Sequence, residues 1–409
     1  MSLRETSRDY RHPRRPWPLR AGHAALRAIG LDRAVPLDPD RLVAHARRQE
    51  GLTDLGEPGL EPLRRLVDAI EAEADLHPFG RFATATRLVQ ALRNRLRAQA
   101  MWTADPSILA RPLPRPIVIT GLQRTGTTAL HRLLAADPRL RALRSWEALN
   151  PAPLPARPGR PDPRVASAVQ AERALRWLSP DFFAVHPVEA QAPEEEVLLL
   201  DHAFLSTVAE ATLRVPSFSA WLEAQDQAPA YAMLRRMLQL LTAQRGPDRW
   251  VLKTPHHLEW LDDLAAALPD AVVVMTHRDP LVTLPSFCSM IAHGRGVMSD
   301  RVDPHEIGRD WLRKVGRMMD RAMAARAGLR VVDVQYREIV DDPHAAVRRI
   351  CEAADLDPPG PAEIAARAAA MPKDRHGIHR YELQDFGLSA DEVAERFKEY
   401  RAAFVGADR

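Results

Sequence analysis

The chain has 409 residues, of which 46% are hydrophobic and 27% are charged, a composition typical of one large or two ordinary soluble domains. Its formal net charge of +3 is too balanced to indicate a nucleic-acid-binding protein, although a local basic pocket for an anion remains compatible with it. Only two cysteines occur, Cys288 and Cys351, which excludes a disulfide framework and a cysteine-rich metal site.

No segment of the sequence indicates a membrane span or a secretory signal. Wholly apolar runs such as "AVVVM" at 271–275 are far shorter than a spanning helix. The arginine-rich N-terminus is not followed by an apolar segment, so we expect a cytoplasmic protein. We interpret the first 35 residues as a solvated arm that packs one aromatic, Trp17; contact of this basic arm with a membrane surface is the alternative.

Residues 1–110 predict a helical N-terminal region. Three segments in it have apolar residues at helical spacing, and none has a strand pattern: "RLVAHARRQEG" at 41–51, "LEPLRRLVDAIEAEADL" at 60–76 and "RFATATRLVQALRNRLRAQAMW" at 81–102. The proline-rich "ARPLPRP" at 110–116 predicts the boundary of this region.

Residues 111–358 predict an α/β core, because short apolar runs alternate there with helical patterns. The strand-like runs are "PIVIT" at 116–120, "RWVLK" at 249–253, "AVVVMTH" at 271–277 and "LRVVDVQY" at 329–336. Apolar strands that alternate with helices predict a three-layer fold, in which helices cover both faces of a central parallel sheet. A helical insertion at 151–248 interrupts the pattern, and we expect it to supply the wall of a substrate site.

The stretch "PIVITGLQRTGTTALHRLL" at 116–134 resembles a phosphate-binding loop between a strand and a helix. Backbone N–H groups of a glycine-bearing turn and of a helix N-terminus bind anions. Gly121 and Gly126 would let the backbone curl around the anion. The lysine of the usual P-loop signature is missing, and Arg124 supplies a planar cation inside the loop instead. An ordinary strand–turn–helix is the alternative for this motif alone. Three threonines, Thr125, Thr127 and Thr128, belong to the predicted site.

A nucleoside-triphosphate enzyme would need a magnesium carboxylate at the end of a neighbouring strand. Here the corresponding strands end in Lys253 and Arg278. Asp279 could be such a ligand, but its place before Pro280 predicts that it caps the following helix. Cations at these positions favour an anionic nucleotide bound without a metal.

A second pattern joins Arg278 to Ser286 in "THRDPLVTLPSF". The arginine ends a predicted strand and the serine lies on the helix that follows. The turn between them can therefore bring a guanidinium and a hydroxyl to one phosphate. The spacing alone is common in sequences, and its place on a strand–helix unit gives it weight.

Together these motifs resemble the sulfotransferases that use 3′-phosphoadenosine-5′-phosphosulfate (PAPS), in particular a bacterial branch with a helical N-terminal region. The loop "GLQRTGTT" is similar to the 5′-phosphosulfate loop of the family, and "RDPLVTLPS" to its 3′-phosphate motif. "VQYREIVDDP" resembles the segment whose tyrosine lies near the adenine, which would be Tyr336. "HRYELQDFGLS" at 379–389 resembles a C-terminal signature of the bacterial branch.

The resemblance implies a metal-independent, in-line transfer of a sulfuryl group from PAPS to a hydroxyl, with adenosine 3′,5′-bisphosphate as the product. Arg124 would stabilise the leaving 5′-phosphate, and Lys253 matches a family lysine near the bridging oxygen. For the base, the resemblance implies either Glu147, in the region where some branches carry a glutamate, or His256, one position later than the histidine of cytosolic members. We favour Glu147.

Residues 359–409 would then form a segment that closes over the nucleotide. Lys373, Arg375 and Gly377 resemble the basic closing loop of cytosolic members, with a solvated basic loop as the alternative. His186 and the glutamates at 194–196 could line the acceptor site, although a charged helix start is the commoner explanation of such glutamates.

The sequence therefore predicts a PAPS-dependent sulfotransferase acting on a small-molecule, lipid or carbohydrate hydroxyl. A P-loop nucleotide kinase and a catalytically inactive, nucleotide-binding partner protein are the alternatives.

Overall fold

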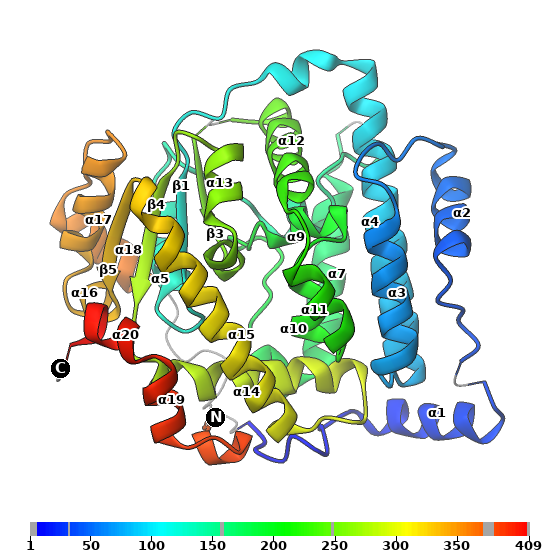
Figure 1. Ribbon diagram of the computed structural model, residues 1–409. Helices are drawn as coiled ribbons and strands as arrows, with labels where there is room; N and C mark the ends of the chain where they lie inside the picture. Colours follow the sequence, from blue (N-terminus) through cyan, green and yellow to red (C-terminus); the bar gives the residue numbers. More distant parts are fainter. Residues whose placement is uncertain (1–5, 32, 156–158, 247–248, 371–379, 407–409) are drawn as a thin grey trace.

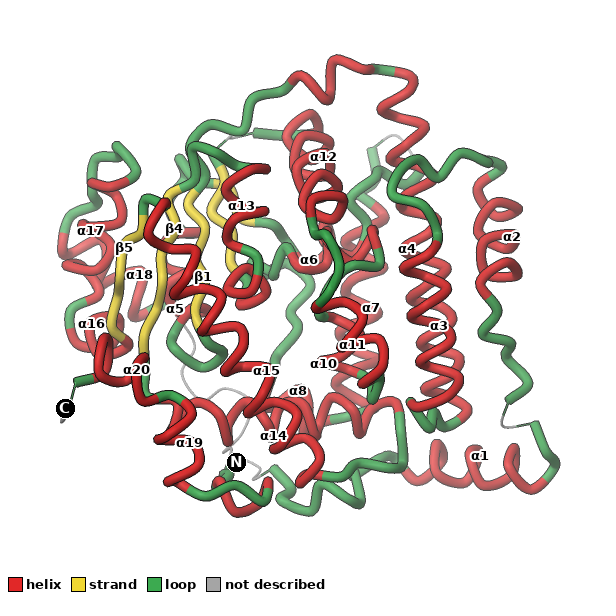
Figure 2. The backbone as a smooth tube through the Cα atoms, in the orientation of Figure 1, coloured by secondary structure: helices red, strands yellow, loops and turns green. Residues whose placement is uncertain are grey.

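The computed structural model describes residues 6–31, 33–155, 159–246, 249–370 and 380–406 (Figure 1). Its centre is a five-stranded sheet in the order β2-β3-β1-β4-β5, and every neighbouring pair of strands is parallel (Figure 2). The strands are β1 (Ile117–Gly121), β2 (Arg141–Ala142), β3 (Trp250–Lys253), β4 (Val272–His277) and β5 (Val331–Gln335). The four predicted strands are thus present, and β2 is an additional two-residue edge strand.

Both faces of the sheet are covered by helices, as the apolar strand sequences predict. Alternate strand residues point to opposite faces, so Ile119 and Val274 pack into one core cluster while Val118 and Val273 pack into the other. The first cluster takes its helices from α5 (Thr127–Ala135), α16 (Tyr336–Asp341), α17 (Pro343–Ala353) and α18 (Pro361–Ala369). The second takes them from α12 (Ala228–Gln244), α13 (Leu261–Ala267), α14 (Pro280–Met298) and α15 (Pro304–Ala325).

The N-terminal region is helical, as predicted, and it shares the second core cluster with the sheet. Leu88 and Leu92 are fully buried in a cluster that also contains Met237 and Leu252. The core is therefore continuous across residue 110. The elements of this region are α1 (Trp17–Ala28), α2 (Pro39–Glu50), α3 (Glu61–Glu73), α4 (Pro78–Ala104) and the 3-10 turn η1 (Pro106–Ala110).

The insertion between β2 and β3 is built from short helices, and the C-terminal segment runs along the carboxyl ends of the strands (Figure 1). The insertion contains α6 (Ser145–Leu149), α7 (Pro163–Leu178), α8 (Pro180–Val185), α9 (Val197–Leu200), η2 (Asp201–Ala203), α10 (Val208–Thr212) and α11 (Pro216–Glu223), followed by α12. The remaining elements are η3 (Pro255–Glu259), η4 (Arg326–Gly328), η5 (Leu383–Phe386), α19 (Ala390–Arg396), α20 (Lys398–Tyr400) and the π-helical turn η6 (Arg401–Val405). No helix in the described ranges is both long and apolar enough to span a bilayer.

Candidate active site

The loop between β1 and α5 has the backbone of an anion site. Gly121 has φ +148°, and a Cβ there would lie 2.3 Å from the Oγ1 of Thr276. Gly126 has φ +89° and precedes α5, where a Cβ would lie 3.1 Å from the ring of Tyr336. Between them Arg124 adopts a left-handed φ of +71°. Since the first N–H groups of a helix have no acceptor within it, this loop and the start of α5 offer donors to an anion.

The three threonines of the loop differ in their surroundings. Thr125 is fully buried; its hydroxyl donates to the Leu122 carbonyl at 2.6 Å and contacts the Thr276 hydroxyl at 2.6 Å. The Thr125 side chain thus holds the loop against β4, and only its backbone amide can serve a ligand. Thr127 is buried and Thr128 is exposed at the first turn of α5.

Arg124 connects the loop to the second predicted motif. Its Nε donates to the Ser286 hydroxyl at 3.1 Å, and its carbonyl accepts from Nη1 of Arg278 at 3.0 Å. The Arg278 guanidinium in turn lies 3.8 Å above the ring of Tyr336. Four residues that the sequence spreads over three motifs are therefore in direct contact at the carboxyl edge of the sheet.

A groove of about 1120 Å³ opens beside this contact. Arg278 and Tyr336 form one wall, and the C-terminal residues 401–406 form another. Asp279 lines the groove too, but its oxygens accept from the Leu281 amide at 2.9 Å and from Arg401 at 3.1 Å. The predicted helix-capping role of Asp279 is thus confirmed. The prediction of a closing segment at 359–409 did not single out residues 401–406. The predicted closing residues Lys373, Arg375 and Gly377 lie outside the described residues.

Lys253, at the end of β3, is buried and paired. Its Nζ lies 2.5 Å from Oε1 of Glu195, and the other oxygen of Glu195 accepts from the Thr254 hydroxyl at 3.2 Å. Burial alone would raise the pKa of Glu195, but the charge and the hydrogen bond of Lys253 outweigh it and leave the pKa below its ordinary value. Glu195 is therefore an ionised carboxylate beside the strand end.

The neighbouring glutamate, Glu196, has a structural role. Glu196 is fully buried, and one of its oxygens accepts from the Lys253 backbone amide at 2.7 Å. The other lies 2.8 Å from Nε2 of His257, whose Nδ1 contacts the Tyr231 hydroxyl at 2.8 Å. Glu196 thus fixes the end of β3 from which Lys253 and Thr254 project.

A cavity of about 180 Å³ lies next to the loop and to Glu195. Gln123 of the loop and Glu195 belong to its lining, together with Thr254 and His256. The rest of the wall is mainly apolar and comes from α8, α10, α14 and α15, so it includes Phe182, Val208, Phe287, Met290, Ile291 and Trp311. An anion loop, a buried lysine and a carboxylate beside a largely apolar cavity form a constellation that can support group transfer.

Comparison with known proteins agrees with this geometry. Residues 116–359 match the family described as the sulfotransferase family. The crystal structure of sulfotransferase STF1 from Mycobacterium tuberculosis is 36% identical, covers 89% of this chain and 99% of its own, and superposes with a TM-score of 0.77. The chain belongs to the sulfotransferase family. Sulfotransferase STF9 from Mycobacterium avium is 27% identical over 90% of this chain and 97% of its own, with a TM-score of 0.79. No sequence among the curated proteins matches the chain.

In this sulfotransferase the favoured base, Glu147, lies apart from the cavity. It is buried, its Oε1 accepts from Arg141 at 2.9 Å and from Arg245 at 3.0 Å, and its Oε2 accepts from the Arg144 amide at 3.0 Å and from Arg245 at 2.8 Å. Glu147 does not belong to the lining of the cavity, and two arginines and a backbone amide hold its oxygens, so it is not placed to meet an acceptor hydroxyl. The preference for Glu147 is therefore wrong for this structure, in which Glu147 joins β2, α6 and the end of α12.

The alternative base, His256, does line the cavity of the sulfotransferase. Its Nδ1 lies 3.2 Å from the Thr207 hydroxyl, and its ring packs 4.4 Å from that of Trp260. Burial lowers the pKa of His256 well below the usual range, so the imidazole is neutral. His186, from the insertion, lines the same cavity, as does Glu195. The sequence predicts only that His186 and Glu195 line the acceptor site.

Proposed function

We propose that this sulfotransferase transfers the sulfuryl group of PAPS to the hydroxyl of an acceptor with an apolar body. The observation that carries the proposal is the contact of Arg124 with both Ser286 and Arg278. PAPS has phosphates on its 5′ and 3′ sides, and this contact joins an anion loop to a separate arginine–serine pair. The 5′-phosphosulfate would occupy the loop, and the 3′-phosphate would meet Arg278 and Ser286.

The adenosine would lie in the groove beside Tyr336. Its volume of about 1120 Å³ is ample for a nucleotide, and its polar lining suits ribose and base. The C-terminal residues 401–406 would form its outer wall. Selectivity for the 3′-phosphate would follow from Arg278, because its half-buried guanidinium lines the groove and can form a charge-assisted contact with an anion there.

The proton of the acceptor would pass to Glu195. The acceptor oxygen forms a bond to sulfur, the bond from sulfur to the 5′-phosphate oxygen breaks, and the carboxylate takes the hydroxyl proton. Charge that grows on the leaving phosphate is stabilised by Arg124, by the loop amides and by Lys253. When Lys253 turns from Glu195 toward the leaving group, it frees the carboxylate and removes the largest of the contacts that lower its pKa.

The cavity restricts the acceptor. Phenylalanine, methionine and isoleucine side chains line much of the cavity of about 180 Å³, and Glu195 with its partner Thr254 lies in the same lining. An acceptor would therefore present one hydroxyl at the polar end and an aliphatic or aromatic body to the rest. This lining favours a phenolic, steroid-like or lipid alcohol over a carbohydrate.

The donor half of the proposal is tested by thermal denaturation in the presence of a chelator. Adenosine 3′,5′-bisphosphate should raise the melting temperature without any divalent ion, since a ligand that binds only the native state stabilises it by mass action. Stabilisation that requires both magnesium and ATP would contradict the proposal and favour a kinase. Incubation with radiolabelled PAPS and pools of apolar alcohols, followed by chromatography, then tests turnover. Nucleotide binding without transfer to any pool would favour an inactive nucleotide-binding protein.

A further inference from the structure

Helix α1 turns an apolar face to the solvent. Trp17, Ala21, Ala25 and Ala28 follow one another at helical spacing, and all four are exposed. Trp17 is 73% exposed, and the residue after the helix, Ile29, is 67% exposed. His23, on the opposite side, is the one residue of the helix that is buried. The expectation that Trp17 packs inside a solvated arm is therefore wrong.

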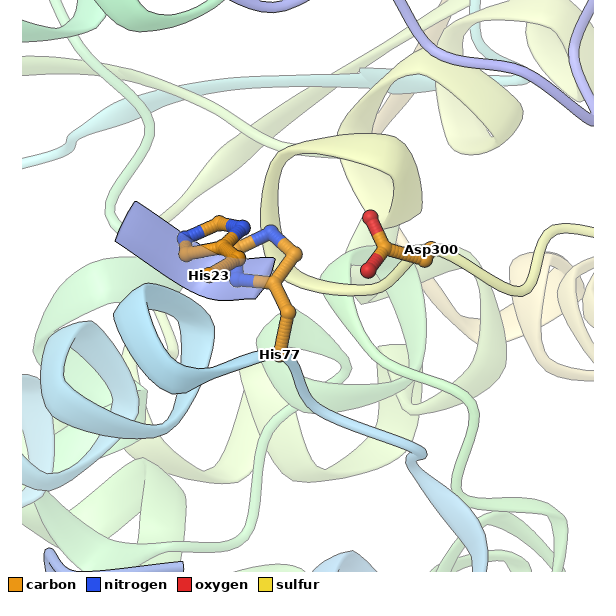
Figure 3. A group of neighbouring side chains, drawn as sticks. All are labelled: His23, His77 and Asp300. Carbon is orange, nitrogen blue, oxygen red and sulfur yellow. The ribbon is translucent and has the colours of Figure 1, made fainter. Parts of the chain in front are cut away.

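The inward side of α1 is anchored by His23, His77 and Asp300 (Figure 3). The rings of His23 and His77 stack with their centroids 4.2 Å apart, and the Asp300 carboxylate binds Arg15 and Arg27 at the two ends of the helix. This group has the composition of a metal site but does not fit one. Nδ1 of His77 accepts from the Gly80 amide at 2.8 Å, so in the neutral ring Nε2 carries the proton and has no lone pair for an ion.

An anchored helix with an uncovered apolar face requires a partner. A helix of 12 residues is marginal in water, and tertiary packing normally supplies most of its stability. Here His23 is the buried residue of the helix and Arg15 and Arg27 pair with Asp300, while Trp17 and the alanines face outward. Contiguous exposed apolar surface of this kind marks a contact with a protein or a membrane.

The charges beside α1 decide between these two partners. Residues 10–31 contain five arginines and no aspartate or glutamate. Three aspartates from elsewhere, Asp181, Asp300 and Asp303, pair with four of the arginines, so the flank keeps a net positive charge. A second copy packed face to face on α1 would bring two positive flanks together. An anionic lipid surface would accept the tryptophan and isoleucine side chains and attract the arginines.

We infer that α1 is an interfacial helix that lies in the surface of an anionic bilayer and holds the enzyme there. Figure 1 shows α1 along the lower edge of the molecule, the side at which the parallel strands end. The carboxyl ends of the strands, where the candidate active site lies, are therefore on the same side of the molecule as α1. This inference stands on α1 and does not depend on PAPS or on the identity of the acceptor.

The test is flotation of the full chain with vesicles of phosphatidylcholine, with and without phosphatidylglycerol. The wild type should float with the anionic vesicles, and the double variant Trp17→Glu/Ile29→Glu should bind at least about tenfold more weakly. Trp177→Glu is the matched control, because Trp177 is also exposed, at 56%, but lies on α7. The control should float like the wild type.

Both glutamates replace exposed side chains, so the melting temperatures of the variants should stay near that of the wild type. Brominated phosphatidylcholine in the same anionic vesicles should quench part of the tryptophan fluorescence, and Trp17→Phe should lose that part. The inference is overturned if the wild type fails to float, or if the double variant floats equally well. A concentration-dependent dimer that the double variant abolishes would overturn it in favour of a second copy of the chain.

Discussion

The Lys253 ammonium and the Glu195 carboxylate lie 2.5 Å apart where β3 ends, at the boundary between the anion loop and the apolar cavity. In the proposed reaction each of these groups has a task that requires it to leave the other. The pair therefore keeps the base ionised but occupied until a donor offers Lys253 a second anion.

Removal of Lys253 should change the pH dependence of catalysis. Glu195 can accept a proton only when ionised, and its lowered pKa keeps it ionised into the acid range. In Lys253→Met the largest influence that lowers this pKa is lost, while burial, which raises it, remains. The acid limb of the pH profile of kcat/KM should move to higher pH. An unchanged limb would contradict the assignment of the base.

Glu195→Gln is the companion experiment. It keeps the shape of the side chain but cannot take a proton, so turnover should fall roughly 10²–10⁴-fold while the affinity for adenosine 3′,5′-bisphosphate stays near that of the wild type. His256→Gln serves as the comparison on the same cavity wall. If His256→Gln loses more turnover than Glu195→Gln, the histidine is the base.

Glu147→Gln should affect stability more than chemistry. Glu147 compensates Arg141, which is fully buried, and Arg245, whose side chain is 40% exposed. Breaking a buried pair on one side costs about 3–5 kcal/mol, because the remaining charge is left without a partner. Urea denaturation should show this loss, whereas kcat measured well below the melting temperature should remain near normal. Arg245→Ala should reduce the free energy of unfolding by less, because Glu147 still pairs with Arg141. A stable but inactive Glu147→Gln enzyme would restore Glu147 as a catalytic residue.

Arg278→Ala should weaken the binding of adenosine 3′,5′-bisphosphate more than the binding of adenosine 5′-monophosphate. Loss of a charge-assisted contact to the 3′-phosphate costs roughly 2–5 kcal/mol. The monophosphate should lose less, though not nothing, because Arg278 also holds the carbonyl of Arg124 in the loop. Ser286→Ala should act in the same direction with a smaller effect. Calorimetry with both nucleotides measures the difference, and equal losses would show that Arg278 only supports the loop.

Stability should decrease in mild acid because several histidines are buried in the neutral state. Burial lowers the pKa of His77 and His131 to about 3 and that of His202 and His293 to about 4. Between these values and the ordinary histidine pKa of about 6.5, the unfolded chain binds protons that the native state does not, so stability rises with pH across this window.

The free energy of unfolding, measured with urea from pH 6.5 down to pH 4.5, should therefore fall as the pH falls. His131→Leu should reduce the slope by about 1.4 kcal/mol per pH unit, which corresponds to one proton. A slope that does not change in this variant would mean that His131 titrates normally in the folded protein.

The sequence was informative where structure depends on neighbouring residues. The four longer strands have their own apolar runs, and Gly121 and Gly126 occupy positions at which the backbone conformation or close packing requires glycine. The resemblance then located Arg278, Ser286 and Tyr336, which the fold brings together. Strand β2 could not be predicted, because two residues show no periodicity.

Roles that depend on distant partners could not be predicted from the sequence. Glu147 looked like a base because of its place after the loop helix, yet Arg245, which neutralises it, is 98 residues away. Glu195 looked like the start of a charged helix, and only the folded chain places it on Lys253. One signal was available in the sequence: a buried lysine at a strand end, such as Lys253, needs a carboxylate partner, and adjacent Glu195 and Glu196 are candidates for it.

Helix α14 contacts three surfaces in turn. Ser286 meets Arg124 near its start, Met290 and Ile291 line the cavity, and Gly296 packs against Pro13 of the N-terminal arm. At about 1.5 Å per residue these points lie within roughly 15 Å on one helix. Because the three contacts share one helix, we expect a substitution in the cavity wall to shift the Ser286 end and the Gly296 end as well. Apparent changes in acceptor preference must for this reason be separated from changes in donor affinity, even for residues that never touch the donor.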